Sequence, residues 1–358
     1  MTLSDISLYR LYNQCISQKS LTIDELVYKM GALQAQDFAM SKWAVGVRVF
    51  GATEKMVEEA ISNATIIRTH LMRPTWHIVS QKDIYWMLSL TAPQIQGQLK
   101  SRHRELGITE DIIKQSELVI RKALSDQRSL TREELNADLE AAGIATNDQR
   151  SAHIFLAHEL NALIASGTIK DKQATYAILT DKVKPETCTK PAEPVIDLAR
   201  RYFHSHGPAT IDDFIWWSGL QISRAKKAME ILQNELASAT VDGKVFWYPA
   251  SVLNDQIPQT TVHLLPAYDE FIISYKDRRA ALPHTHMQKV LNKNGIFWPV
   301  VIQNGQVVGT WLRTVKKDKV LVSVVFFKPA TQKLKRQVEE AAFVFGKFLG
   351  LKAEVKFE

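Results

Sequence analysis

One short pattern recurs three times in this chain: a threonine followed, three residues later, by an acidic residue at the start of an amphipathic segment. The copies are Leu21–Leu26, Leu130–Leu135 and Ala209–Phe214. Such a threonine caps a helix, and the acid three residues on closes a capping box. The first two copies carry glutamate there and predict full boxes, whereas the third carries an aspartate of shorter reach. Three helices are therefore expected to begin in the same way.

Each copy lies between two further helical patterns and leads into β-prone residues. The preceding patterns are Ser4–Ser17, Glu110–Ser125 and Glu193–His206; the following ones are Thr53–Asn63, Asp148–Ser166 and Ser223–Glu235; the β-prone runs are Ile66–Val79, Thr168–Leu179 and Ser238–Tyr248. Helix, capped helix, helix and hairpin is the order of a winged helix. Asp242-Gly243 is a strong hairpin signal for the third wing. A generic helical bundle is the alternative, and the three recurrences favour winged helices over it.

The composition changes after Pro249 and predicts a different module. His263–Tyr275, a hairpin around Asn304-Gly305 and Lys319–Phe327 are expected as strands, and Thr331–Leu349 as a closing helix. The predicted fold is α+β, with three tandem winged-helix units followed by a C-terminal β-rich α+β module. The expected domains are winged helix one at 1–80, a helical connector at 81–108, winged helix two at 109–180, winged helix three at 193–250 and the C-terminal module at 251–358.

Composition limits the class of protein. A hydrophobic content of 46% and a charged content of 23% are typical of a soluble globular chain, and no apolar run reaches the ~20 residues of a membrane span. The N-terminal residues do not resemble a signal peptide, and two cysteines, Cys15 and Cys188, fit a reducing cytoplasm. A net charge of +7 is only mildly basic, so composition permits a nucleic-acid partner without requiring one.

The best candidate for chemistry is the segment Met30–Phe38, which contains Gln34, Gln36 and Asp37 at the end of a helical pattern. In a helix the two glutamines would point about 200° apart, because successive residues turn by roughly 100°. They can face one site only if the helix opens here into irregular or extended chain. Gly31 makes such an opening plausible.

Basic residues gather in three places that suit phosphate contacts in a winged-helix protein. The first wing interleaves them with Trp76, the third recognition helix carries them near its start, and eight Lys and Arg lie between Arg313 and Arg336. The predicted DNA-binding residues are Arg68, His70, Arg73, His77, Arg224, Lys226, Lys227, Lys316 and Lys317. The second recognition helix, around Ile154 and Phe155, is too apolar for a groove and is expected to pack against a neighbour.

Common catalytic signatures are not found: the sequence has no P-loop, Cys-x-x-Cys or zincin motif, and we expect no metal and no cofactor. The pairs His204/His206 and His284/His286 are expected to be surface or cap features. Asp269 and Glu270 would point to opposite faces of the expected strand, with Asp269 binding Arg278 or Arg279.

Four stretches carry a resemblance to a known family. They are Leu33-Gln34-Ala35-Gln36, Arg68 to His77, Leu264 to Asp269 and Val308-Gly309-Thr310-Trp311. In this order, and over nearly the whole chain, they resemble the AlkZ/YcaQ-type DNA glycosylases of the winged-helix DNA-binding family. The resemblance implies a C-shaped body around double-stranded DNA and a central Gln-x-Gln motif that excises alkylated purines. Gln34 and Gln36 match that motif.

The resemblance implies a monofunctional glycosylase that acts on cationic N7- or N3-alkylpurines, with interstrand crosslinks as a further substrate. Such a base is already primed to leave, so the enzyme needs to hold a water and stabilise an oxocarbenium-like sugar. A glutamine carbonyl can do both, and Asp37 is the competing candidate for activating the water. We expect a nucleoid-associated monomer in the cytoplasm. The alternative is a non-catalytic winged-helix DNA-binding protein or regulator.

Overall fold

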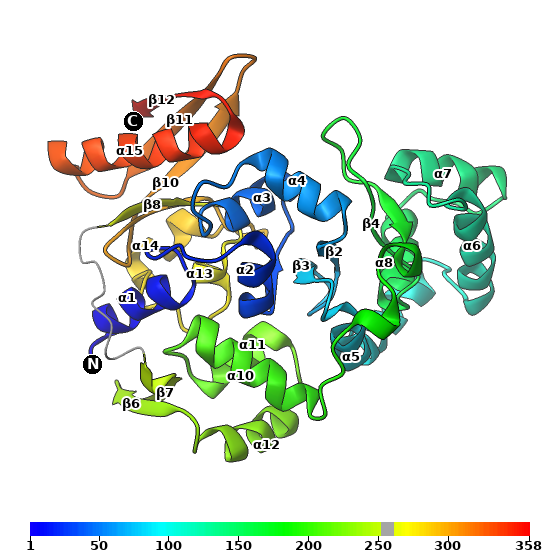
Figure 1. The fold of residues 1–358 in the computed structure, drawn as a ribbon, viewed down its shortest axis with the longest axis horizontal. Helices are drawn as coiled ribbons and strands as arrows, with labels where there is room; N and C mark the ends of the chain where they lie inside the picture. Colours follow the sequence, from blue (N-terminus) through cyan, green and yellow to red (C-terminus); the bar gives the residue numbers. More distant parts are fainter. Residues whose placement is uncertain (252–260) are drawn as a thin grey trace. The chain divides into compact units, whose positions relative to one another are not determined.

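The structure, a computed structural model, describes residues 1–251 and 261–358 and is drawn in Figure 1. The chain forms two compact units. Unit one contains Met1–Val57 and Val195–Glu358, and unit two contains Glu58–Pro194. The division falls within α4 (Glu54–Ser62), so it separates the helices of the predicted first winged helix from its wing. The predicted domain boundaries therefore stay predictions, and residues 252–260 of the C-terminal boundary lie outside the described residues.

The N-terminal part of unit one is helical, with one short extended segment. All three recurrent threonines of the chain make capping boxes: Thr22 with Glu25, Thr131 with Glu134 and Thr210 with Asp213, so the shorter aspartate also reaches. The elements in order are α1 (Leu3–Asn13), α2 (Ile23–Met30), β1 (Ala32–Gln34) and α3 (Phe38–Gly46).

Three helices and a hairpin make up the next part of unit one, in the order of a winged helix. They are α10 (Pro194–His206), α11 (Ile211–Ser218), α12 (Ile222–Leu232), β6 (Ala237–Val241) and β7 (Lys244–Tyr248). Asp242 and Gly243 both have positive φ, 48° and 72°, as a tight turn between antiparallel strands requires. The hairpin predicted from this dipeptide is confirmed.

A five-stranded sheet in the order β12-β11-β10-β9-β8 organises the C-terminal part of unit one. Its strands are β8 (Val262–Leu265), β9 (Val300–Gln303), β10 (Gln306–Val315), β11 (Lys319–Phe326) and β12 (Lys352–Phe357). The short helices α13 (Glu270–Ile273) and α14 (His284–Val290) follow β8, and α15 (Gln332–Leu349) follows β11. Trp311 of β10 packs edge-on against Phe345 of α15, with ring centroids 5.1 Å apart.

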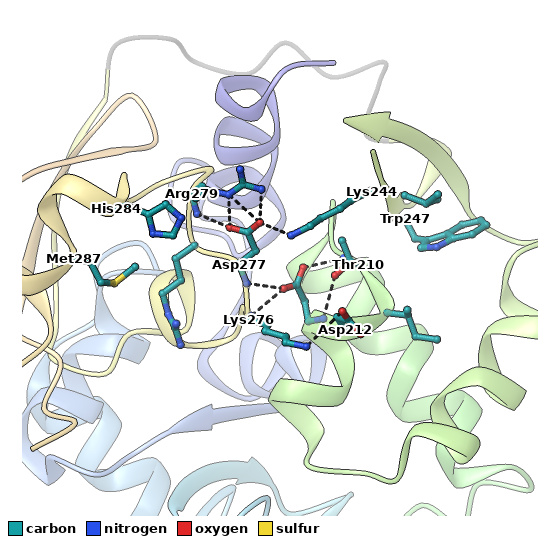
Figure 2. A pocket seen from close by; sticks show the side chains of 13 residues that line it. Thr210, Asp212, Lys244, Trp247, Lys276, Asp277, Arg279, His284 and Met287 are labelled. Atoms are coloured by element: carbon teal, nitrogen blue, oxygen red, sulfur yellow. Dashed lines mark hydrogen bonds and ion pairs between the residues drawn. The ribbon is translucent and has the colours of Figure 1, made fainter. Parts of the chain in front are cut away.

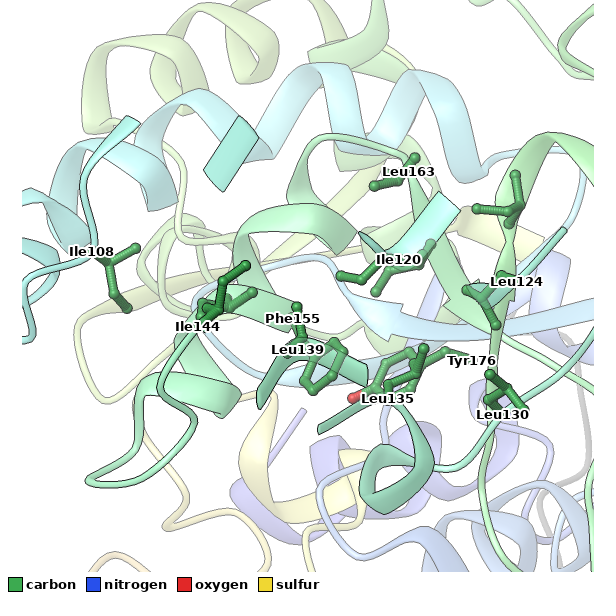
Figure 3. Packing of buried hydrophobic residues seen from close by; sticks show 13 residues of the cluster. Ile108, Ile120, Leu124, Leu130, Leu135, Leu139, Ile144, Phe155, Leu163 and Tyr176 are labelled. Atoms are coloured by element: carbon green, nitrogen blue, oxygen red, sulfur yellow. The ribbon is translucent and has the colours of Figure 1, made fainter. Parts of the chain in front are cut away.

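Unit two contains the first wing, a long helix and a second three-helix segment with its own hairpin. Its elements are β2 (Ile66–His70), β3 (Trp76–Ser80), α5 (Ile84–Glu105), α6 (Glu110–Ala123), α7 (Arg132–Ala141), α8 (Arg150–Leu160), β4 (Ile164–Ser166), β5 (Tyr176–Ile178) and α9 (Leu179–Lys182), followed by a 3-10 turn at Pro185–Thr187. Figure 3 shows its main core, where Phe155 of α8 lies among leucines and isoleucines of the other elements. Leu156 and Leu160 pack on α5, which confirms that this helix covers a neighbour.

The α+β class is confirmed, two local predictions are wrong and one strand was not predicted. The run His263–Tyr275 is a strand only to Leu265, because Tyr268 takes a positive φ of 57° and α13 begins at Glu270. The helix predicted over Asp148–Ser166 ends at Leu160, and its last residues form β4 instead. Strand β12 was not predicted; it pairs parallel to β11 after α15 has crossed back.

Candidate functional site

The Gln-x-Gln segment leaves the helix as predicted. Helix α2 ends at Met30, and Gly31 follows it with a φ of 75° that side chains other than hydrogen rarely allow. The chain is then extended through Gln34 and irregular through Gln36, before α3 begins at Phe38. Gln34 is buried, with 8% of its surface exposed, whereas Gln36 is exposed. The two amides therefore have different surroundings.

Glu270 is a buried hydrogen-bond partner of Gln34. The backbone N–H of Gln34 donates to Oε1 of Glu270 at 2.5 Å, across 236 positions of sequence. The second oxygen, Oε2, accepts from Nε1 of Trp217 at 3.1 Å and from the hydroxyl of Ser274. Glu270 is 1% exposed, so a buried carboxylate supports the chain at the first glutamine.

Buried His206 completes this polar cluster within unit one. Its Nε2 lies 3.6 Å from Oε2 of Glu270, and its ring stacks on Tyr202 with centroids 4.9 Å apart. Burial lowers the pKa of His206, and the neighbouring Glu270 opposes that effect. The prediction that the pair His204/His206 is a surface or cap feature is therefore wrong for His206, whose ring is buried against Glu270 and Tyr202, whereas His204 is exposed.

Asp37 has a structural role at the start of α3. Its side chain accepts the N–H of Met40 at 3.0 Å and caps the helix. Burial, followed by the charge of Asp37, raises the pKa of the Tyr268 phenol. One carboxylate oxygen of Asp37 is thus committed to the cap, in a half-buried position beside the motif.

Asp269 does not bind Arg278 or Arg279, so that prediction is wrong. Its two oxygens accept from Nη1 and Nη2 of Arg48, each at 2.8 Å, and both residues are fully buried. The reason is that Asp269 caps α13 by accepting the N–H of Phe271, and this turns it inward. Because the chain is helical here, Asp269 and Glu270 do not lie on the two faces of a strand.

The first wing, in unit two, holds its polar residues largely inside. Arg68 is 7% exposed, and its guanidinium lies 3.9 Å from the centre of the Trp76 ring. His70 is 8% exposed and approaches Oε2 of Glu159 with its Nδ1 at 2.5 Å. His77 is fully buried, with Nδ1 3.0 Å from the carbonyl of Thr75. This burial argues against His77 as a direct phosphate contact. Arg73, half-buried with a φ of 54°, lies in the turn between the strands.

The remaining predicted DNA contacts lie on exposed surface of unit one. Arg224, Lys226 and Lys227 are exposed on α12, whose opposite face is buried through Ala225, Ala228, Met229 and Leu232. Lys316 and Lys317 are exposed at the turn between β10 and β11.

A cavity of about 770 Å³ in unit one holds none of the predicted site residues (Figure 2). Most of its charges are paired with each other: Lys244 contacts Asp277 at 2.6 Å, Arg279 contacts Asp277 at 2.7 Å and Lys276 contacts Asp212 at 3.5 Å. The hydrogen bond from Arg279 holds the pKa of Asp277 well below its usual range. These pairs leave the cavity close to neutral.

Residues 1–251 and 261–358 contain neither a candidate metal-binding cluster nor a candidate membrane-spanning helix. No group of three or more His, Cys, Asp or Glu in this part of the chain could hold a metal ion. No helix there is both long and apolar enough to span a membrane.

Glu270 was not predicted as a partner of the motif, although its carboxylate accepts the Gln34 N–H. The contacts of Trp217 and His206 with Glu270, and of Arg48 with Asp269, were not predicted either. The adjacent acids at 269 and 270 were visible, but no spacing in the sequence connects them to residues 34 and 48. Their assignment to a strand also predicted the wrong direction for both side chains.

Comparison with known proteins gives a consistent result. The chain is 24% identical over 355 residues to an interstrand DNA cross-link repair glycosylase of Streptomyces sahachiroi, covering 94% of each chain. Its fold matches the structure of the Streptomyces sahachiroi DNA glycosylase AlkZ with a TM-score of 0.80 at 20% identity, over the full length of both chains. A family model for AlkZ-like DNA glycosylases matches residues 27–348, which include the Gln-x-Gln segment and Glu270. The chain belongs to the AlkZ-like DNA glycosylase family.

Proposed function

We propose that this DNA glycosylase is monofunctional and hydrolyses the N-glycosidic bond of cationic N7- or N3-alkylpurines, with Gln34 and Gln36 as its catalytic amides. The observation that carries the proposal is the segment itself. It is an irregular piece of chain that is held by the buried Glu270 and presents an exposed amide, Gln36, two residues after a buried one, Gln34. A rigid support of this kind suits groups that act by position.

The proposed reaction does not need the protein to protonate the leaving base. An alkylated purine carries a positive charge, so its bond to the sugar breaks without a general acid. The developing oxocarbenium ion and the attacking water then need oriented dipoles, which an amide carbonyl supplies. A glutamine cannot form a Schiff base, so the base is released and the strand stays uncut.

The two amides have different parts in this proposal. Gln36 is exposed and accessible to a nucleotide, so we assign to it the water and the sugar. Gln34 is buried, and its backbone N–H donates to Glu270. We therefore assign to Gln34 the orientation of Gln36 and the inner wall of the site. Asp37 stays the competing base, but its bond to the N–H of Met40 supports a capping role instead.

DNA binding in this proposal uses the exposed cations, with Arg224, Lys226 and Lys227 of α12 and the Lys316-Lys317 turn as phosphate contacts. Arg73 of the first wing joins them, whereas Arg68 and His70 support Trp76 from within the wing. We further propose that the enzyme works as a monomer on cytoplasmic, nucleoid-associated DNA.

Interstrand crosslinks are a second proposed substrate. A relative that covers 94% of the chain is named a cross-link repair glycosylase, and a site whose catalytic amide is exposed can accept a bulky adduct. The alternative, a regulator that keeps only the scaffold, would protect a specific palindromic sequence. A glycosylase would bind damaged or abasic duplex with little sequence preference.

The decisive experiment is single-turnover base release from a duplex that contains N7-methylguanine, scored as alkali-labile breaks. Gln34→Ala and Gln36→Ala should each slow release by about 10²–10³-fold, the usual cost of losing one preorganised dipole. Their affinity for the duplex should stay at the parent value. Gln36→Glu, which can still hold a water, should keep part of the activity.

Asp37→Asn is the matched control, because asparagine also caps helices. If both glutamine variants release the base at the parent rate while Asp37→Asn is inactive, Asp37 is the catalyst and the assignment is wrong. A parent protein that releases no alkylated base at all would overturn the proposed activity.

A further inference from the structure

Glu270 occupies an unusual position for a carboxylate that no catalytic role explains. It is 1% exposed, stands at the first position of α13 and accepts hydrogen bonds from donors on three parts of unit one. These are the backbone of Gln34, the indole of Trp217 on α11 and the hydroxyl of Ser274 just after α13. A side chain that only filled space here would be apolar, because burying a carboxylate is costly.

We propose that Glu270 is a positioning residue for the glycosylase reaction, which fixes the Gln-x-Gln segment through the backbone N–H of Gln34. The inference rests on the proposed function of that segment and goes beyond it, because it assigns the geometry of the catalytic amides to a residue of the C-terminal module. Glu270 does not touch the reacting atoms. It acts by holding the chain from which Gln36 projects.

The number of donors explains why the residue is a glutamate. The N–H groups of Gln34 and Trp217 can only donate, and they approach different oxygens of the side chain. An ionised carboxylate offers an acceptor on each oxygen, and the hydroxyl of Ser274 can donate to it as well. A glutamine at position 270 could accept a hydrogen bond from only one of these two N–H groups. With its carbonyl toward Gln34, its NH2 would face the Trp217 N–H, and in the other orientation it would face the Gln34 N–H. Arg48, His206, Tyr202 and Tyr275 are titratable neighbours of this carboxylate.

The adjacent residue, Asp269, fixes the chain just after α3. Asp269 binds Arg48 with both oxygens at 2.8 Å, and Arg48 also donates from Nη1 to the carbonyl of Ala44 at 2.9 Å, near the end of α3. Two neighbouring carboxylates thus attach to the chain before and after Gln36 and α3. This arrangement limits the freedom of the irregular residues between them.

The test compares Glu270→Gln with Trp217→Phe in the full-length protein. Trp217→Phe removes one donor to Glu270 and leaves its bond to Gln34, so it reports the purely structural effect. We expect Glu270→Gln to slow single-turnover release of N7-methylguanine by about 10²-fold, as a misplacement of about 1 Å can do. Its duplex affinity should stay unchanged, and Trp217→Phe should keep a rate close to that of the parent. Equal rates for Glu270→Gln and the parent, or equal losses in the two variants, would overturn the proposal.

A second measurement does not depend on activity. Amide hydrogen exchange at Gln34 should be slow in the parent and faster in Glu270→Gln by on the order of 10-fold or more, because a charge-assisted bond is lost. If Glu270→Gln does not fold, the exchange rate of the Gln34 amide in the parent protein is the test, and fast exchange there would overturn the proposal. Gln36→Ala separates the two hypotheses. If Gln36→Ala releases the base at the rate of the parent, the proposed catalytic role of Gln36 is wrong. The exchange rate of the Gln34 amide tests the contact with Glu270 independently of that result.

Discussion

Helices α8 and α12 occupy equivalent positions in the chain order of their segments but differ in which side chains are exposed. Each is the third helix of its segment and follows a helix with a threonine capping box, at Thr131 or Thr210. In α8 a continuous run from Ile154 to Leu160 is buried, and this run includes His158 and Glu159. In α12 only four residues are buried, and the cations are exposed. The shared caps therefore specify where a helix starts but not what it binds.

The polar residues of α8 bind other residues of unit two. Glu159 pairs with His70 of the first wing, and Nε2 of His158 lies 2.8 Å from the hydroxyl of Ser116 on α6. These contacts, all within unit two, occupy groups that would otherwise be available to DNA. We conclude that α8 stabilises unit two, whereas α12 is free to serve as a binding surface.

Phe155→Ala on α8 should have the largest effect on the free energy of unfolding. Phe155 is fully buried and stacks on Tyr176, with ring centroids 4.9 Å apart and an interplanar angle of 14°. Removing a buried phenylalanine typically costs about 3–5 kcal/mol, through lost burial and the remaining cavity. The free energy of unfolding of unit two, measured by denaturant titration, should fall by that amount. Ile222→Ala on α12, where the side chain is 59% exposed, is the control and should change stability by less than about 0.5 kcal/mol. A similar loss in the two variants would break the comparison.

His158 should make the stability of unit two depend on pH. Burial lowers its pKa from 6.5 to about 4 in the folded protein. The folded state therefore keeps the imidazole neutral while the unfolded chain takes up a proton, so stability is lost as the pH falls from about 7 toward 4. By pH 5 the loss from this group is about 2 kcal/mol.

The measurement for His158 is the difference in unfolding free energy between pH 7 and pH 5, in the parent and in His158→Gln. The variant cannot titrate, so its loss should be smaller by the amount assigned to His158. Comparing variant with parent removes the contribution of other buried histidines, such as His206. If the two proteins lose the same stability, burial of His158 does not control the acid sensitivity of α8.

Neutralising the cations of α12 should have the smallest effect on folding and a clear effect on binding. Arg224→Gln, Lys226→Gln and Lys227→Gln, made singly, should each reduce the slope of log affinity against log salt by roughly 1 wherever a phosphate contact is lost. Their unfolding free energies should stay within about 0.5 kcal/mol of the parent. Lys122→Gln, on an exposed position of α6, is the matched control and should leave the slope unchanged. Slopes that respond to Lys122 but not to the three α12 residues would place the DNA surface elsewhere.

The sequence by itself determined the features that depend on neighbours in the chain. The three capping boxes, the hairpin turns at Asp242-Gly243 and Asn304-Gly305 and the opening of helix α2 before Gln34 all follow from contacts or dihedral angles within a few residues. The family resemblance, carried by short motifs, was of the same local kind and is confirmed.

Only the tertiary structure decided what supports the motif and which cations are exposed. The contacts from Gln34 to Glu270 and from Arg48 to Asp269 span 236 and 221 positions, and the His70–Glu159 pair spans 89. Side chains brought together over such separations leave no periodic trace in the sequence, because their pairing depends on how whole elements pack. The same holds for Arg68 and His77, which are basic or titratable in the sequence but buried by the fold.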